Sequence, residues 1–216
     1  MEKNKSKSLN TDQSLICYRN LVKKKQIDEI FRTIVSLFKS YFPELFLWVP
    51  KKVDSTIWKS QKFHNSIIKA RKISKKKFGK IYDTLQLTTS VKNMMTSENI
   101  LSIVERFSNV KREKLISFNS IIRFDPPFDD KNSVGWHYDV YPNSGLKMNP
   151  ISGITVTVAL HNTKINHGSP IFLLNSHKKE TRMNIIKNKK NFSETYSIDQ
   201  EEINSFERKS FEAKVG

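Results

Sequence analysis

The apolar positions of the chain follow a helical period in its first half. Apolar side chains recur every three to four residues in one segment, a spacing that places them on a single face of an α helix: Ile27, Ile30, Phe31, Ile34, Leu37 and Phe38. Pro43 ends this pattern, because proline breaks the interior of a helix. Residues 43–58 mix proline, tryptophan and phenylalanine without a clear period, which predicts a packed loop.

The same spacing predicts two further helices. Each has a serine ahead of its apolar positions, and a serine hydroxyl can accept a hydrogen bond from the free N–H groups at a helix start. Ser74 precedes the apolar positions of residues 78–85, and Ser97 precedes those of residues 100–107. Residues 15–112 are therefore predicted to be mostly helical, whereas the polar, lysine-rich residues 1–14 are predicted to be disordered.

Near residue 115 the period of the pattern shortens to two, which is typical of strands. Four segments have this character: residues 115–124, 134–140, 153–162 and 170–174. Residues 178–208 are polar and predict a long excursion with some helix, and alternation over residues 211–215 predicts the opening of another strand. Strands at this spacing favour a jelly-roll sandwich. The sequence thus predicts an α+β fold of one domain, residues 1–216, whose helical N-terminal half packs on an incomplete double-stranded β-helix (jelly roll) formed by residues 113–216.

Composition narrows the class of protein. The 38 lysines and arginines exceed the 21 acids and give a formal charge of +17, but they occur as short scattered runs such as 23–25, 51–52 and 75–77. We interpret them as a solvated surface rather than as a nucleic-acid site. The single cysteine, Cys17, excludes an internal disulfide and a thiolate metal cluster. Without an apolar leader or a long apolar run, the sequence predicts a cytoplasmic protein without a membrane partner.

The clearest chemical signal is the segment Gly135-Trp136-His137-Tyr138-Asp139. On an extended strand, residues two apart point to the same side, so the His137 imidazole and the Asp139 carboxylate can coordinate one ion together. They supply two of the three ligands of the two-His, one-carboxylate triad that holds non-haem Fe(II). We expect both side chains to project into the interior of the sandwich. A hydrogen-bonded pair at a strand end is the alternative.

The strand-rich half resembles the phytanoyl-CoA dioxygenase family of Fe(II)/2-oxoglutarate oxygenases. The resemblance covers roughly residues 113–180 and is carried by four segments: Arg123-Phe124-Asp125-Pro126-Pro127, Trp136-His137-Tyr138-Asp139, Thr155-Val156-Thr157-Val158-Ala159-Leu160 and the run from Asn166 to Lys178. The family's usual form of that last run is an Asn-Gly turn, a strand and then Gly-Ser-His-Lys. Here His167 splits the Asn-Gly pair, and Asn175 replaces the last glycine.

The resemblance implies a hydroxylase that uses Fe(II), 2-oxoglutarate as cosubstrate and O2 on a small-molecule substrate. It implies that His137 and Asp139 are metal ligands, and Arg123 and Thr157 are weaker candidates for contacts to the cosubstrate. His177 matches a Ser-His-Lys histidine that is normally not a ligand in this family. The family's distal histidine and its cosubstrate arginine lie further along, beyond a Gly-Asp turn whose lead-in residues 211–216 resemble. The chain is therefore expected to be a fragment with little turnover of its own.

A second hypothesis belongs to another class of protein. The chain is then a catalytically inactive remnant or a basic binding module, whose charge of +17 attracts an anionic partner. An incomplete jelly roll leaves strand edges and apolar surface uncovered, so under either hypothesis the isolated chain is expected to associate or to dissolve poorly.

Overall fold

The computed structural model describes residues 15–117, 120–123, 136–137, 154–165, 169–176, 183–188 and 193–216. The predicted disordered segment, residues 1–14, lies outside the described residues. The chain divides into two compact units, named here by their main secondary structure. The helical unit holds the described residues of Asn20–Asp129, Val158–Asn162 and Lys214–Gly216, and the strand unit holds the described residues of Met1–Arg19, Asp130–Thr157 and Thr163–Ala213. The expectation of a single domain stays a prediction.

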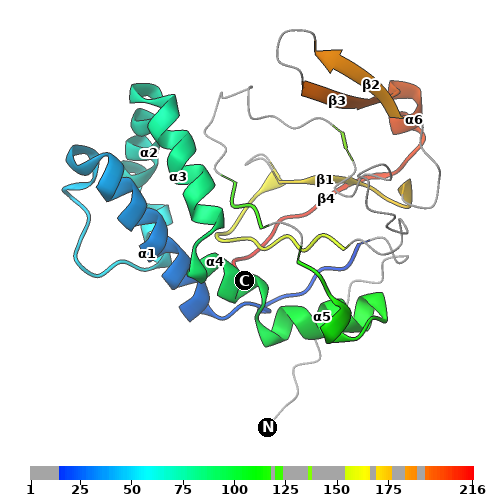
Figure 1. Cartoon of the computed structure of the whole chain (residues 1–216), viewed down its shortest axis with the longest axis horizontal. Helices are drawn as coiled ribbons and strands as arrows, with labels where there is room; N and C mark the ends of the chain where they lie inside the picture. Colours follow the sequence, from blue (N-terminus) through cyan, green and yellow to red (C-terminus); the bar gives the residue numbers. More distant parts are fainter. Residues whose placement is uncertain are drawn as a thin grey trace. The chain divides into compact units, whose positions relative to one another are not determined.

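Five α helices form most of the helical unit (Figure 1): α1 (Lys24–Tyr41), α2 (Gln61–Ile73), α3 (Lys75–Gln86), α4 (Thr89–Met95) and α5 (Glu98–Ser108). Three short 3-10 turns accompany them: η1 (Pro43–Phe46), η2 (Ser55–Lys59) and η3 (Arg112–Lys114). The three predicted helices are confirmed as α1, α3 and α5. The predicted packed loop contains η1 and η2.

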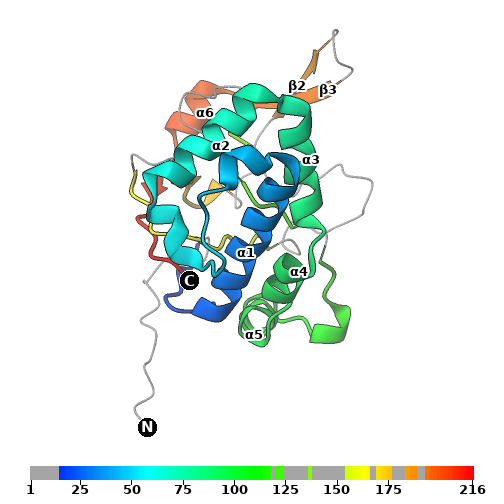
Figure 2. The same cartoon turned by 90° about the vertical axis from the view of Figure 1, so that its left-hand side faces the viewer.

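An aromatic cluster forms the centre of the helical unit. Phe38 of α1 is fully buried, and its ring centroid lies 5.3 Å from that of Phe46 and 5.7 Å from that of Phe78. Phe63 extends the cluster, with its ring centroid 6.4 Å from that of Phe46. Because these rings come from α1, η1, α2 and α3, one cluster joins four elements; Figures 1 and 2 show α2 and α3 beside α1.

A single residue, Ser74, joins α2 to α3. Its backbone N–H donates to the carbonyl of Ala70 at 3.1 Å and so closes the last turn of α2. Its Oγ accepts a hydrogen bond from the N–H of Lys77 at 3.2 Å, which is the predicted cap of α3. Ser97 also stands at the predicted start of α5, but its buried Oγ has no hydrogen-bond partner within the described part of the chain. The expected capping bond of α5 is therefore wrong.

The strand unit contains two antiparallel pairs. β1 (Ile171–Leu173) pairs with β4 (Arg208–Ser210), and β2 (Met183–Asn188) pairs with β3 (Ser193–Ile198) in a hairpin followed by α6 (Gln200–Asn204). The strand predicted at 170–174 is confirmed as β1. The strand predicted at 211–215 begins earlier, as β4, and continues only as an isolated bridge between Thr163 and Ala213. The excursion predicted at 178–208 holds one short helix, but its main structure is the hairpin, which the prediction missed.

Two other predicted strands are absent from the described residues. Residues 115–117, 120–123 and 154–160 are extended or irregular and pair with no neighbouring strand there. Residues 154–157 keep the alternating exposure of a strand, with Thr155 and Thr157 exposed and Ile154 and Val156 half-buried. A strand is stabilised by its ladder of backbone bonds to a neighbour, so the side-chain pattern alone does not produce one. The mixed α+β class is confirmed, whereas the jelly roll stays a proposal.

No helix in the described part of the chain is long and apolar enough to cross a membrane.

The aromatic cluster predicts the most sensitive core position. Phe38→Ala removes a fully buried ring, and replacing a buried phenylalanine by alanine costs about 3–5 kcal/mol of unfolding free energy. Phe107→Ala is the matched control, because the Phe107 side chain on α5 is 44% exposed. Urea unfolding followed by circular dichroism measures both. An equal loss in the two variants would contradict the assignment of Phe38 to the centre of the core.

Arg112 clamps the two ends of α5 to η3. Its guanidinium binds both carboxylate oxygens of Glu98, at 2.6 and 2.9 Å, and Glu105 Oε2, at 2.6 Å from Nη2. Its backbone N–H also donates to Glu105 Oε1 at 2.9 Å. The hydrogen bonds from Arg112, followed by one from Ser102, lower the pKa of Glu98 to about 2 from a usual value of 4.5.

This clamp predicts a pH dependence of stability. A carboxylate whose pKa is lowered by folding stabilises the protein above its unfolded pKa, here 4.5, and loses that contribution as the pH falls toward about 2. The melting temperature of Glu98→Gln should therefore lie below that of the parent chain at pH 6, and the two should converge between pH 4.5 and 2. Glu113→Gln, which removes another exposed acid, should show no such convergence; parallel curves for Glu98→Gln would refute the clamp.

Candidate functional site

The structure places one of the two expected metal ligands, His137, at the surface of the strand unit. Trp136, immediately before it, is half-buried, and the Arg208 guanidinium lies over its ring at 5.7 Å from the centroid. Arg208 opens β4 and donates from Nη2 to Asn204 Oδ1 at 2.6 Å. A cation stacked on an indole is a favourable contact. The Trp-His step is thus held against β4, and His137 is exposed.

The turn after β1 has the backbone geometry of a glycine. Asn175 has φ of 60°, in the left-handed region, where asparagine is among the few non-glycine residues commonly found. Ser176 Oγ closes this turn by donating to the carbonyl of Leu173 at 2.9 Å. Asn175 thus adopts a backbone conformation that glycine adopts most readily.

The remaining sequence-predicted site residues are not brought together by the described structure. Arg123 lies in the helical unit and Thr157 in the strand unit, and both side chains are exposed. Asp139 and His177 lie outside the described residues. The joint projection of His137 and Asp139 therefore stays a prediction, as do the contacts of Arg123 and Thr157 to a cosubstrate.

Two described histidines have structural surroundings. His161 stacks on Trp58, with ring centroids 4.9 Å apart, and the His64 ring contacts the Trp58 carbonyl through Nε2. Within the described residues, no group of three or more histidine, cysteine or acidic side chains is placed to hold a metal ion. Burial raises the pKa of the Cys17 thiol, with the nearby Lys209 opposing the shift, so this cysteine lacks the lowered pKa of a reactive thiolate.

A feature that the sequence analysis missed is the acid-free interval that covers the end of η2, α2 and the start of α3; its cations are called the basic face below. No acid occurs between Asp54 and Asp83, whereas this interval holds nine cations: Lys59, Lys62, Lys69, Arg71, Lys72, Lys75, Lys76, Lys77 and Lys80. All except Arg71 are exposed. The runs of adjacent lysines are short, so they suggest scattered charge. The informative signal was the absence of acids over the whole interval.

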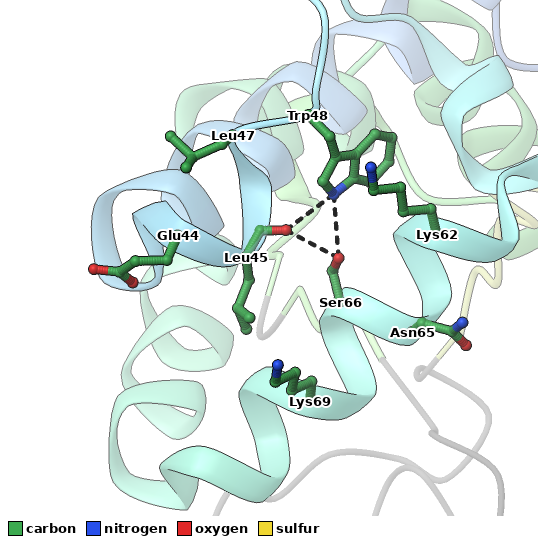
Figure 3. Close-up of a pocket in the computed structure, with 8 residues that line it drawn as sticks. All are labelled: Glu44, Leu45, Leu47, Trp48, Lys62, Asn65, Ser66 and Lys69. Carbon is green, nitrogen blue, oxygen red and sulfur yellow. Dashed lines mark hydrogen bonds between the residues drawn. The ribbon is translucent and has the colours of Figure 1, made fainter.

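An open pocket of about 350 Å³ borders this face (Figure 3). Leu45, Leu47 and Trp48 form its apolar wall, and α2 contributes a polar rim of Lys62, Asn65, Ser66 and Lys69. The Trp48 Nε1–H donates to the Leu45 carbonyl at 2.9 Å and to Ser66 Oγ at 3.2 Å, and Ser66 Oγ donates to the same carbonyl at 3.0 Å. This triangle of bonds fixes the indole at the pocket wall.

Comparisons with known proteins assign no family to the chain: no family model, no curated protein and no solved structure matches it.

The left-handed turn at Asn175 gives a test of local geometry. Asn175→Gly should leave stability nearly unchanged, because glycine adopts positive φ without a steric penalty. Asn175→Val should lower the free energy of unfolding by about 1–2 kcal/mol, the typical cost of a left-handed conformation for an L-residue with a Cβ. Thermal unfolding measures both variants. If valine were tolerated as well as glycine, the glycine-like turn would be excluded.

Proposed function

We propose that this protein belongs to the phytanoyl-CoA dioxygenase family and that its parent activity is Fe(II)/2-oxoglutarate-dependent hydroxylation of a small molecule. The proposal rests on the motifs of residues 113–180. The observation that supports it most is the turn after β1. The strand β1 is followed by Asn175 in the left-handed conformation that glycine adopts readily, and Asn175 stands where the resemblance places the glycine of the Gly-Ser-His-Lys run.

The donor set fits a hard divalent ion such as Fe(II). His137 offers a neutral imidazole and Asp139 a carboxylate, both common ligands of non-haem iron. The His137 side chain is exposed. When bound, Fe(II) with 2-oxoglutarate would supply the oxidising chemistry, and the chain's own residues would fix the ligand geometry and keep water from the site.

The contact between Arg208 and Trp136 supports a positioning role for the β1–β4 pair. A ring held against β4 restricts the backbone just before His137. Metal ligands of designed and natural sites are precise when their neighbours lock them in place. We propose that the finer architecture is a partial jelly roll, to which the β1–β4 pair belongs.

Metal binding tests this proposal independently of turnover. Co(II) serves as an air-stable stand-in for Fe(II), and its visible absorption reports ligation by nitrogen and oxygen donors. Wild-type protein should bind Co(II), and either His137→Ala or Asp139→Ala should weaken the affinity by at least about tenfold, since each removes one of few ligands. His177→Ala is the matched control and should bind as the wild type does.

The outcomes of these measurements decide whether the proposed metal site exists and which residues form it. Absence of Co(II) binding by the wild type, or equal binding by all variants, would overturn the metal site. Loss of binding in His177→Ala would instead make His177 the third ligand. Succinate release with Fe(II), ascorbate and 2-oxoglutarate, abolished by the same substitution, would confirm that role.

A further inference from the structure

We propose that the basic face of α2 and α3 binds single-stranded nucleic acid through its phosphates and accepts one unpaired base in the neighbouring Trp48 pocket. The proposal is independent of the metal site, because every residue it uses belongs to the helical unit. The face is defined by the nine cations between residues 59 and 80, and the pocket by the side chains of Figure 3.

The cations of α2 form one line along the helix. Lys62, Lys69 and Lys72 lie on one row of α2, with the neutral amide of Asn65 between the first two; the successive spacings are three, four and three residues, and all four side chains are exposed. With a rise of about 1.5 Å per residue, the line is about 15 Å long. The opposite face of α2 is buried through Phe63 and its apolar neighbours. A linear row of positive charges matches a linear row of phosphates.

The first turn of α3 carries positive charges at a position where positive charge destabilises a helix. Lys75, Lys76 and Lys77 occupy its first turn, where the helix dipole is already positive, and no acid stands in that turn. Acidic residues there would stabilise the helix, so the arrangement lowers stability unless an anion binds. Nearby acids are few: Asp54 and Asp83 bound the segment, and Glu44 lines the pocket.

Aromatic rings hold part of the face in place. Lys62 Nζ lies 5.2 Å from the centroid of Trp48, the Arg71 guanidinium 5.2 Å from that of Phe78, and Lys77 Nζ 5.8 Å from that of Phe42. Cations resting on rings lose less conformational freedom when they bind an anion. The face is therefore partly ordered before its partner arrives.

The pocket selects a single strand over other anionic partners. Its apolar wall includes Leu47, which is 81% exposed, and its open volume of about 350 Å³ is enough for a flat base. Bases are available to such a pocket only when they are unpaired. A membrane surface would need an apolar helix face to insert, whereas the apolar faces of α2 and α3 are buried in the protein. Lysines, unlike arginines, lack the forked geometry that reads guanine, so binding is expected without sequence preference.

Fluorescence anisotropy with labelled 20-mers of thymidine and uridine, at 50 to 200 mM NaCl, tests the proposal. The triple variant Lys62→Gln, Lys69→Gln, Lys72→Gln should weaken binding at least about tenfold. It should also reduce the slope of log affinity against log salt by about 2, since each phosphate contact on a single strand contributes about 0.7. The matched control Lys92→Gln, Lys111→Gln, Lys114→Gln removes the same charge from other exposed positions of the helical unit and should bind as the wild type does.

A third variant separates the effect on binding from an effect on folding. Lys76→Glu should raise the melting temperature, because it places an acid in the first turn of α3, and it should weaken binding. No binding at 50 mM NaCl, equal losses in the two triple variants, or a duplex bound as tightly as the single strand would each overturn the proposal. Binding to phosphatidylserine vesicles without binding to the oligonucleotides would overturn it in favour of a membrane surface.

Discussion

The contact of Phe38 with Phe46 and Phe78 is the interaction on which the helical unit depends. It packs α1 against η1, which follows it directly in the chain, and against α3, which begins more than thirty residues later. Burying these rings removes a large apolar area from water, and offset or edge-on packing adds to that gain. Once the three rings have packed, α2 and α3 have a fixed inner side, and their outer sides are fixed with it.

The positive charges on the outer sides of α2 and α3 lower the stability of these helices. Like charges crowd α2 and the first turn of α3, and the helix dipole increases the repulsion there. By contrast, Arg112 pairs with Glu98 at the start of α5 and with Glu105 in its last turn, and Lys24 pairs with Asp28 at 2.7 Å on α1. The same unit thus neutralises charge in some places and accumulates it in another. That contrast is the physical reason for assigning a partner to α2 and α3 rather than to the whole surface.

The elements that the sequence predicted well are those in which local pattern and packing agree. The buried Ile27, Ile30, Ile34 and Phe38 of α1 repeat at helical spacing, and the hydroxyl of Ser74 caps α3 as its position suggests. Strand prediction failed more often, because a strand needs a partner that may be distant in the chain. The segment 154–157 alternates as a strand does yet belongs to no ladder among the described residues, whereas β2 and β3 pair within a stretch that was interpreted by its polarity alone.

For the candidate sites, the sequence indicated which residue types take part, but it did not predict which residues contact one another in the folded chain. It identified the Trp-His step, but the stacking of Arg208 on Trp136 joins residues far apart in the chain and carries no local signal. At Asn175 the backbone has a positive φ, a conformation that asparagine tolerates better than most residues. The Trp48 pocket depends on a loop residue meeting the side of α2, which periodicity does not encode.

The one-residue joint at Ser74 has a consequence for how this sequence can change over evolution. Successive residues of a helix are rotated by about 100° around its axis. An insertion or deletion within the last turn of α2 would turn the residues beyond it by that angle, and the inner contact of Phe78 and the outward direction of the lysines would no longer be compatible. Exposed lysines can be substituted one at a time, whereas an insertion or deletion between Phe63 and Phe78 would disrupt the packing of α3. Chain length across this joint is therefore expected to be more strictly preserved among descendants of this gene than the identity of any surface side chain that it displays.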